Sequence, residues 1–406
     1  MRVTFRKGRA EGSVYAPTSK SMAHRLLICA GLSEGKSVIH GVSECEDVLA
    51  TIDCLRAFGI ECVRDGDTVT VIGGKDLVKH APTESLCCRE SGSTLRFLLP
   101  VALLSGSDTV LCGASGLMQR PMTVYEEICA ERGLKYEKRD GCITVKGPLS
   151  AGEYKVVGNI SSQFISGLIF ALTLADGDSI ISITSPIESR SYINLTVSAL
   201  REFGVTVTWS DERTLYIKGN QKYCACETTV EGDYSNAAFL DALNLLDGSV
   251  EVLGLNDGSL QGDKVYKGMY RMLCKGTPTI HIGDCPDLGP VLFALSAVKN
   301  GAVFSGTRRL KIKESDRSGA MAEELKKFGT SVTVYDDSVV VYPADFHAPS
   351  EPLCGHNDHR IVMALSVLLT LTGGCIEGAE AVKKSFPDFF ECLSSLGIDI
   401  ETEEAL

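Results

Sequence analysis

The 406-residue sequence has no apolar run of the 18 or so residues that a membrane-spanning helix needs. Its best candidate, Ile361 to Leu371, has about the length of a buried helix. The N-terminus begins with the alternating pattern Met-Arg-Val-Thr-Phe of a strand, which argues against a secretory signal. We therefore expect no membrane partner and a cytoplasmic location.

Disulfide and metal patterns are also missing, although the sequence contains sixteen cysteines. None of them form a CxxC pair, and the close pairs at 87–88 and 224–226 have no matching His or Cys pair at zinc spacing. Many cysteines lie among apolar residues, where cysteine acts as a small hydrophobic side chain. The pattern predicts reduced, structural cysteines and no metal site.

Nucleotide and nucleic-acid signatures are absent as well. The pattern GxxxxGK[ST] does not occur, and no GxGxxG follows the first strand. The net charge of -12 disfavours binding to nucleic acid, and no basic patch interleaved with aromatic residues is present. What is left is an ordinary globular composition on a chain long enough for two domains.

Six similar units follow one another along the chain. Each opens with a short polar motif and continues into an apolar helix, a strand, a second helix and a β-hairpin. In the fourth unit, the hairpin is expected to be the clipped segment TPTIHIG. The second helices end at glycines that recur roughly every 70 residues, with one shorter interval: Gly59, Gly133, Gly204, Gly276, Gly329 and Gly397.

The sixth unit lacks its last strand, while the N-terminal strand MRVTFRKG belongs to no unit. The simplest closure pairs these two segments. The sequence then predicts one domain of three repeats from residues 1–15 and 230–406, and a second domain of three repeats from residues 16–229. A solenoid scaffold is the alternative, but solenoid repeats rarely carry charged and hydroxyl residues at the helix starts of every unit.

Polar and cationic residues collect at the repeat openings, which read TSKSMAHR, ESGSTLR, SSQ, DYSN, DLG and NDHR. Ser, Asp and Asn before a helix are expected to be N-caps. A cation in the first turn opposes the helix dipole, so the basic residues at these openings indicate bound anions: Lys20, Arg25, Arg96 and Arg360. Small substrates with several phosphates and carboxylates would fit such a site. His359 is better explained as a hydrogen-bonded or acid–base residue than as a metal ligand.

Four segments resemble the 5-enolpyruvylshikimate-3-phosphate synthase family: PTSKSMAHR at 17–25, LKIKESDR at 310–317, NDHR at 357–360 and KSFPDF at 384–389. The resemblance implies an α/β fold of two similar domains, each of three βαβαββ repeats in an inside-out α/β barrel, with helices converging on an inter-domain cleft. It implies transfer of the enolpyruvyl group of phosphoenolpyruvate to the 5-hydroxyl of shikimate-3-phosphate, within aromatic amino acid (chorismate) biosynthesis. This reaction involves no electron transfer, so no cofactor is expected, and nothing in the sequence demands an oligomer, so we expect a monomer.

The same resemblance implies roles for individual residues. Asp287 and Glu314 would transfer protons, with Lys20 as a third catalytic residue. The shikimate-3-phosphate ligands would be Lys20, Ser21, Arg25, Ser161, Ser162, Gln163, Ser189, Tyr192, Asp287 and Lys313. The phosphoenolpyruvate ligands would be Lys20, Gly92, Arg120, Gln163, Arg317, Arg360 and Lys384. The chain departs from the family pattern at Glu90 and Arg309, and no role is implied for either.

Two other functions would share the repeat architecture. An enolpyruvyl transferase acting on a UDP-aminosugar would lack the SSQ and KESDR motifs at these places. A non-catalytic anion-binding relative would have lost at least one of Lys20, Asp287, Glu314 and Arg360, and all four are present. An RNA-processing enzyme of similar repeat fold is disfavoured by the acidic net charge.

Overall fold

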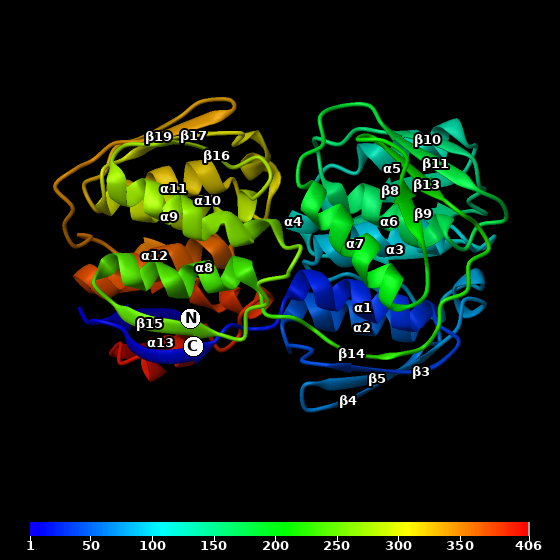
Figure 1. The fold of residues 1–406 in the computed structure, drawn as a ribbon, viewed down its shortest axis with the longest axis horizontal. Coiled ribbons are helices and arrows are strands. Elements are labelled where there is room, and N and C mark those ends of the chain that lie inside the picture. The colour runs from blue at the N-terminus through cyan, green and yellow to red at the C-terminus, as the bar shows by residue number, and fades with distance from the viewer. Residues whose placement is uncertain (405–406) are drawn as a thin grey trace. The chain divides into compact units, whose positions relative to one another are not determined.

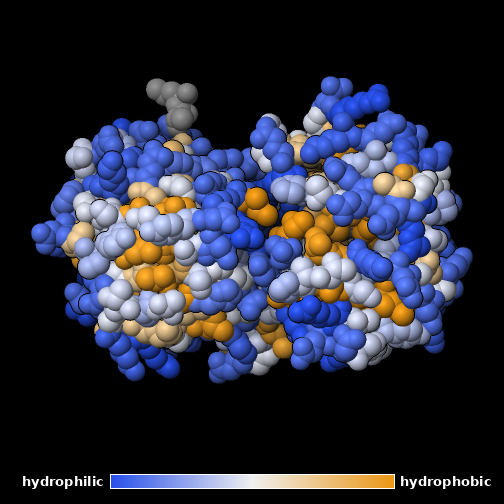
Figure 2. Space-filling view, turned by 90° about the horizontal axis from the view of Figure 1, so that it is seen from above, coloured by the Kyte–Doolittle hydropathy of each residue, from blue (hydrophilic) through white to orange (hydrophobic). Residues whose placement is uncertain are grey.

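The computed structural model describes residues 1–404, which form two compact units (Figure 1). Unit 1 consists of Met1–Pro17 and the chain from Gly232 onward, and unit 2 is Thr18–Glu231. Each unit has its own hydrophobic core. Among residues 1–404, no helix is long and apolar enough to cross a membrane. Hydrophilic residues cover most of the face drawn in Figure 2, with apolar residues in limited patches.

Unit 2 contains three four-stranded sheets, ordered β14-β3-β5-β4, β6-β7-β9-β8 and β10-β11-β13-β12. In each sheet the first pair is parallel, and the last three strands are antiparallel neighbours. The strands are β3 (Gly35–His40), β4 (Glu61–Asp65), β5 (Thr68–Gly73), β6 (Leu86–Cys87), β7 (Thr109–Cys112), β8 (Lys135–Arg139), β9 (Cys142–Lys146), β10 (Glu153–Val156), β11 (Ser179–Ile183), β12 (Val207–Trp209), β13 (Thr214–Ile217) and β14 (Glu227–Thr229).

The helices of unit 2 lie inside its sheets (Figure 1). The first helix of each repeat is apolar on nearly all sides, which suits a helix surrounded by protein. In α1, every residue from Met22 to Leu32 is buried. The helices are α1 (Lys20–Leu32), α2 (Glu46–Ala57), α3 (Gly92–Ala102), α4 (Ser115–Met118), α5 (Thr123–Glu131), α6 (Ser162–Leu172), α7 (Arg190–Glu202) and the 3-10 turn η1 (Leu77–Lys79).

Unit 1 has two four-stranded sheets, β20-β21-β1-β22 and β16-β17-β19-β18, and the two-stranded sheet β15-β2. Its strands are β1 (Arg2–Phe5), β2 (Glu11–Tyr15), β15 (Ser249–Leu253), β16 (Thr279–His281), β17 (Ala302–Ser305), β18 (Val332–Val334), β19 (Ser338–Val341), β20 (Leu353–Cys354), β21 (Gly374–Glu377) and β22 (Ile400–Glu403). None of the sheets formed by the described residues closes into a barrel.

Unit 1 follows the same plan, with α8 (Tyr234–Ala242), α10 (Gly289–Val298) and α12 (His359–Thr372) as its buried helices. The remaining helices and 3-10 turns are η2 (Leu243–Leu246), η3 (Gly262–Val265), α9 (Tyr266–Lys275), η4 (Pro286–Leu288), η5 (Arg308–Ile312), α11 (Arg317–Lys326), η6 (Ala379–Lys384) and α13 (Phe389–Ser395).

The N-terminal segment supplies strands to two sheets of unit 1. Strand β1 lies between β21 and β22 and is antiparallel to both, with Arg2 opposite Glu377 and Glu403. It therefore takes the place that the second hairpin strand has in the other four-stranded sheets. Strand β2 pairs in parallel with β15 and provides the first strand of the fourth repeat, a pairing that the repeat pattern did not predict.

The prediction of a hairpin in the fourth repeat was wrong. Thr279–His281 of TPTIHIG form β16, which is parallel to β17 and starts the fifth repeat. Five of the six predicted capping glycines have left-handed φ values of 64° to 89°, whereas Gly276 after α9 has φ 160° and ψ -153°, an extended backbone. The chain runs from α9 into β16 without a hairpin, so the interval at this repeat is short and no left-handed cap is needed.

Candidate active site

Five of the six repeat openings cap their helices with a side chain. Ser19, Ser91, Ser161, Asp233 and Asp358 each accept a hydrogen bond from a backbone N–H in the first turn.

The fifth opening has no such cap, although an Asp before a helix is commonly one and capping was the alternative explanation for Asp287. Helix α10 begins at Gly289, its N-cap is Leu288, and no side chain caps it. Asp287 lies in the preceding 3-10 turn η4. Its carboxylate contacts cations instead, which shows that a capping role does not explain this aspartate.

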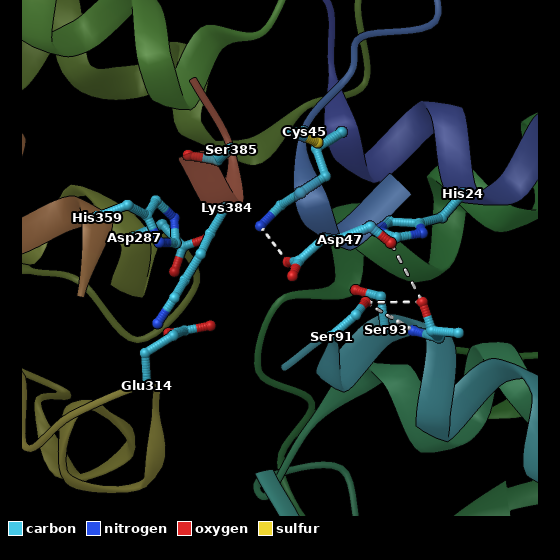
Figure 3. A network of polar contacts seen from close by, with 12 residues as sticks. His24, Cys45, Asp47, Ser91, Ser93, Asp287, Glu314, His359, Lys384 and Ser385 are labelled. Atoms are coloured by element: carbon cyan, nitrogen blue, oxygen red, sulfur yellow. Dashed lines mark hydrogen bonds and ion pairs between the residues drawn. The ribbon is translucent and has the colours of Figure 1, made fainter. Parts of the chain in front are cut away.

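In unit 2, Lys20 begins α1 and its Nζ lies 2.7 Å from Asp47 Oδ2 on α2 (dashed contact of Asp47 in Figure 3). The two side chains are 14% and 10% exposed, so the pair is largely shielded from solvent. Ser21, the next residue of α1, is half-buried. Asp47 had no motif to mark it and was missed by the sequence analysis.

A buried chain of hydroxyls fixes the helices behind this ion pair. His24 Nδ1 lies 2.7 Å from Thr51 Oγ1, Thr51 lies 2.7 Å from Thr94 Oγ1, and Thr94 donates to Ser91 Oγ at 2.7 Å. The chain joins α1, α2 and α3, and His24 and Ser91 are labelled in Figure 3. Burial, with the nearby Lys20 and Arg25 charges, holds the pKa of His24 well below its usual value. The imidazole is therefore neutral and adds no charge behind the cations.

Arg25 is almost completely buried on α1, and its hydrogen-bond partners are neutral. Nε donates to Thr196 Oγ1 at 2.8 Å and Nη2 donates to the Tyr192 carbonyl at 2.9 Å. Its guanidinium also lies over the Phe97 ring, 5.0 Å from the centroid. Burial lowers the pKa of Arg25 to about 10, which leaves it charged at neutral pH. An anion beside it would compensate a charge that these partners only solvate.

Gln163, the second residue of α6, connects two repeats of unit 2. Its Oε1 accepts from Arg96 Nη1 at 2.8 Å, and its Nε2 donates to Ser93 Oγ at 2.9 Å. Gly92 begins α3 beside this group. A Cβ at Gly92 would lie 2.9 Å from Arg120 Nη1 and 3.2 Å from Arg96 Nη1, so a side chain there would displace guanidinium groups.

The remaining predicted unit 2 residues lie at the starts of α6 and α7. Ser161 caps α6, and Ser162 is buried in its first turn. Ser189 is the buried residue before α7 and has the left-handed φ of 59°, which is uncommon for serine. Tyr192 follows on α7 and is half-buried.

In unit 1, three carboxylates surround the guanidinium of Arg317. Nη1 donates to Asp287 Oδ1 at 2.7 Å, Nη2 to Glu314 Oε2 at 2.7 Å, and Nε to Asp358 Oδ2 at 2.8 Å. Burial alone would lower the pKa of Arg317, but Asp358, Glu314 and Asp287 together raise it above its ordinary value. The sequence identifies Asp358 only as part of the NDHR motif and does not predict its contact with Arg317.

Asp287 meets three cations. Besides Arg317, Lys313 Nζ lies 3.2 Å from Oδ1 and Arg360 Nη2 lies 3.8 Å from Oδ2. Burial opposes ionisation of Asp287, but Lys313, Arg317 and Arg360 outweigh it and hold its pKa well below the usual range. Burial lowers the pKa of Lys313, against the pull of Asp287.

Amide oxygens hold Arg360 and a further cation of unit 1, Lys384. Arg360 Nη1 donates to Asn236 Oδ1 of α8 at 3.0 Å. Lys384, buried at the end of η6, donates to the Asn357 carbonyl at 2.6 Å. Figure 3 shows Asp287, Glu314 and Lys384 on three different segments of unit 1. Asn236 was not predicted, because an Asn in the first turn of a helix resembles a local capping residue.

A family model described as EPSP synthase (3-phosphoshikimate 1-carboxyvinyltransferase) matches residues 6–393. The chain belongs to the EPSP synthase family. A Clostridium kluyveri protein named 3-phosphoshikimate 1-carboxyvinyltransferase is 38% identical to this chain. The alignment covers 98% of this chain and 98% of the Clostridium kluyveri protein. A Clostridium perfringens protein of the same name is also 38% identical, with 98% of each chain covered.

Solved EPSP synthase structures share the fold. Two from Acinetobacter baumannii have TM-scores of 0.77 and 0.78, at 23% and 22% identity, and cover 99% and 100% of this chain. The predicted two-domain α/β fold class is thereby confirmed. Membership of the EPSP synthase family also makes the chain an enzyme, as predicted.

Proposed function

We infer that the chain transfers the enolpyruvyl group of phosphoenolpyruvate to the 5-hydroxyl of shikimate-3-phosphate, releasing phosphate, in aromatic amino acid biosynthesis. The observation that carries this function is the match of nearly the whole chain to EPSP synthase and to relatives of that activity. The UDP-aminosugar alternative is not favoured, because these relatives carry the name 3-phosphoshikimate 1-carboxyvinyltransferase.

The hydroxyl gives up its proton as its oxygen joins C2 of phosphoenolpyruvate and C3 receives a proton. Phosphate then leaves from C2 while C3 gives a proton back, which restores the methylene of the enolpyruvyl group. It needs charge neutralisation for two phosphates and two carboxylates, and proton transfer at oxygen and at carbon. No electron transfer occurs, so the residues themselves suffice and we propose no cofactor or metal.

For shikimate-3-phosphate, we propose ligands mainly from unit 2. The neutral surroundings of Arg25 support this assignment, since a phosphate would supply the missing negative charge. The remaining proposed ligands are Lys20, Ser21, Ser161, Ser162, Gln163, Ser189 and Tyr192, with Asp287 and Lys313 from unit 1.

For phosphoenolpyruvate, we propose Arg317, Arg360 and Lys384 of unit 1. From unit 2 we propose Lys20, Gly92, Arg120 and Gln163. The absence of a side chain at Gly92 supports its place here, because a Cβ there would displace the adjacent guanidinium groups of Arg120 and Arg96, which we propose to hold a small anion. We add Arg96 to this set because its guanidinium donates a hydrogen bond to Gln163.

Asp287 and Glu314 are the proposed proton-transfer residues, with Lys20 as the third catalytic group. With its pKa well below the usual range, Asp287 is ionised but is a weak base. Substrate anions that share Lys313, Arg317 and Arg360 would weaken their hold on Asp287 and raise its pKa toward a useful value. Binding of the substrates would thus prepare the base.

We also propose that the protein works as a monomer in the cytoplasm, with no nucleic-acid or membrane partner. Its sixteen cysteines, all within the described part of the chain, are free thiols, which suits a reducing compartment.

Phosphate release on mixing the protein with phosphoenolpyruvate and an acceptor tests the function. We expect release with shikimate-3-phosphate and none with UDP-N-acetylglucosamine. Release with the UDP-sugar alone would establish the alternative transferase, and no release with either would favour a non-catalytic relative.

A further inference from the structure

The loop from Cys354 to Asp358, which joins β20 to α12, has an unusual backbone. His356 and Asn357 are consecutive and both left-handed, with φ values of 48° and 50°. Residues other than glycine adopt this conformation infrequently, and it persists where surrounding contacts determine it. Contacts with the rest of unit 1 therefore determine the shape of this loop.

A fully buried carboxylate, Glu324, supplies those contacts from α11. Its Oε2 accepts from the Cys354 backbone N–H at 2.9 Å, and its Oε1 lies 3.0 Å from His356 Nε2. Lys327 Nζ lies 3.0 Å from Oε2 and balances the charge. Glu324 thus fixes both the start and the centre of the loop.

The other end of the loop contacts three of the proposed phosphoenolpyruvate ligands, Arg317, Arg360 and Lys384. The Asn357 carbonyl accepts from Lys384 Nζ at 2.6 Å. Asp358 accepts from Arg317 Nε at 2.8 Å and from the Arg360 backbone N–H at 2.9 Å. Three cations of unit 1 therefore depend on where this loop lies.

Helix α11 holds the loop at two points. Arg317 begins the helix and binds Asp358, while Glu324, seven residues later, binds Cys354 and His356. Seven residues make about two turns, so both side chains leave the same side of the helix. The loop is thus attached to one face of α11 at each end.

We propose that Glu324 and His356 are positioning residues that set the 354–358 loop, and through it Arg317, Arg360 and Lys384, for phosphoenolpyruvate. The inference rests on the proposed function. Glu323, Glu324 and His356 also lie close enough together to hold a metal ion. We favour positioning, because the Lys327 ammonium and the Cys354 N–H already occupy Glu324 Oε2.

The His356 contact depends on protonation. The hydrogen bond to Glu324 raises the pKa of His356; burial opposes the rise, Glu323 adds to it, and Lys327 opposes it. A raised pKa means that the contact is fully formed below the ordinary value near 6.5 and weakens as pH rises through the folded-state pKa. The KM for phosphoenolpyruvate should therefore increase with pH above neutrality.

Two histidine variants separate the contact from the backbone requirement. His356→Asn suits the left-handed backbone but is too short to reach Glu324, whereas His356→Gln is long enough to donate and does not titrate. We expect His356→Asn to raise the KM for phosphoenolpyruvate about tenfold, the size of one hydrogen bond to a charged group. The KM for shikimate-3-phosphate should change less than about twofold, within the usual reach of a distant substitution.

His356→Gln should keep the wild-type KM near pH 6 and lose its increase at higher pH. Glu324→Gln should behave as His356→Asn does. The matched control is His80→Gln, an exposed histidine of unit 2, which should leave both KM values and their pH profiles unchanged.

Hydrogen exchange provides a measurement that needs no turnover. Amides at 354–360 should exchange faster in Glu324→Gln and His356→Asn than in the wild type, with the rest of unit 1 unchanged. Equal exchange, or an active wild type whose KM for phosphoenolpyruvate is the same in all variants, would overturn the inference. Faster exchange in a wild-type protein that releases no phosphate would support the positioning contact and overturn the proposed function instead.

Discussion

Two buried arginines near helix starts show how differently the two units hold positive charge. Arg25 of unit 2 has a threonine hydroxyl and backbone carbonyls around its guanidinium. Arg317 of unit 1 has three carboxylates. Burial lowers the pKa of the first to about 10, while the carboxylates raise the pKa of the second above its ordinary value.

The surroundings of these two arginines represent two kinds of anion-binding site. Around Arg25 the charge is solvated without being neutralised, so an incoming phosphate meets little competition. Around Arg317 the charge is already neutralised, so an anion has to share it with Asp287, Glu314 and Asp358. The second arrangement binds more weakly but couples binding to the protonation of its carboxylates.

The largest expected effect concerns the carboxylates around Arg317. Asp287→Asn should lower turnover by roughly 10²–10⁴, the usual size of a general acid–base contribution, while the helix start stays intact because Asp287 caps nothing. Glu314→Gln should do the same, with slowed exchange of solvent deuterium into the methylene of phosphoenolpyruvate. Steady-state kinetics measures the turnover, and circular dichroism checks that the variants remain folded. Near-normal turnover in either variant would remove that residue from the mechanism.

The next effect is on stability, and it contrasts the two arginines directly. Arg317→Met leaves three carboxylates facing one another and should reduce the free energy of unfolding by about 3–5 kcal/mol. Arg25→Met removes a buried charge without a carboxylate partner and should change it by less than about 1 kcal/mol. Both should lose activity. Urea unfolding followed by circular dichroism measures the difference, and equal destabilisation would mean that the two sites are electrostatically alike.

Ligand binding should stabilise unit 2 through Arg25. At a hundred times its Kd, shikimate-3-phosphate should add about 2.7 kcal/mol to the free energy of unfolding. Trp209, the single tryptophan of the sequence, lies in unit 2 and reports its unfolding by fluorescence. Arg25→Met should remove the shift. A full shift in that variant would show that Arg25 is not a phosphate ligand.

The smallest expected effect is a difference in acid sensitivity. The depressed pKa of Asp287 stabilises unit 1 above its unfolded-state pKa near 3.9, and this contribution is lost as pH falls below that value. Burial opposes ionisation of Glu324, but hydrogen bonds from His356, the Cys354 N–H and Lys327 lower its pKa, so it contributes in the same direction. Unit 1 should therefore lose stability as pH falls below about 4, the unfolded-state range of these carboxyls, while unit 2 should lose less. Hydrogen exchange, followed separately for the amides of each unit, measures this loss of stability. A greater loss in unit 2 at low pH would contradict the prediction.

Local chemistry explains what the sequence predicted well. Left-handed glycines such as Gly59 and Gly133 end helices, and Asp-Gly turns join strands, so five repeats could be read from short patterns. The fourth hairpin failed because an isolated strand such as TPTIHIG has the same pattern whether its partner is adjacent or distant. The pairing of β2 with β15 joins residues more than 200 positions apart, and no short pattern records it.

In the candidate site, too, the sequence reveals some residues, while others become visible only in the structure. The cations Lys20, Arg25 and Arg360 break the rule that helix starts favour negative residues, so the sequence reveals them. Their partners Asp47 and Asn236 follow ordinary helix-start preferences and become visible only through tertiary contacts. Asp287 looked like a cap because the 3-10 turn η4 shifts the start of α10 past it.

The position of β1 has a consequence for how the protein is made. Unit 2 is continuous in sequence and can be complete soon after its last residue leaves the ribosome. Strand β1 precedes unit 2 in the sequence, whereas its neighbours β21 and β22 follow unit 2. While unit 2 is being synthesised, β1 therefore has an unpaired strand edge, and any factor that shields it would act before unit 1 can fold.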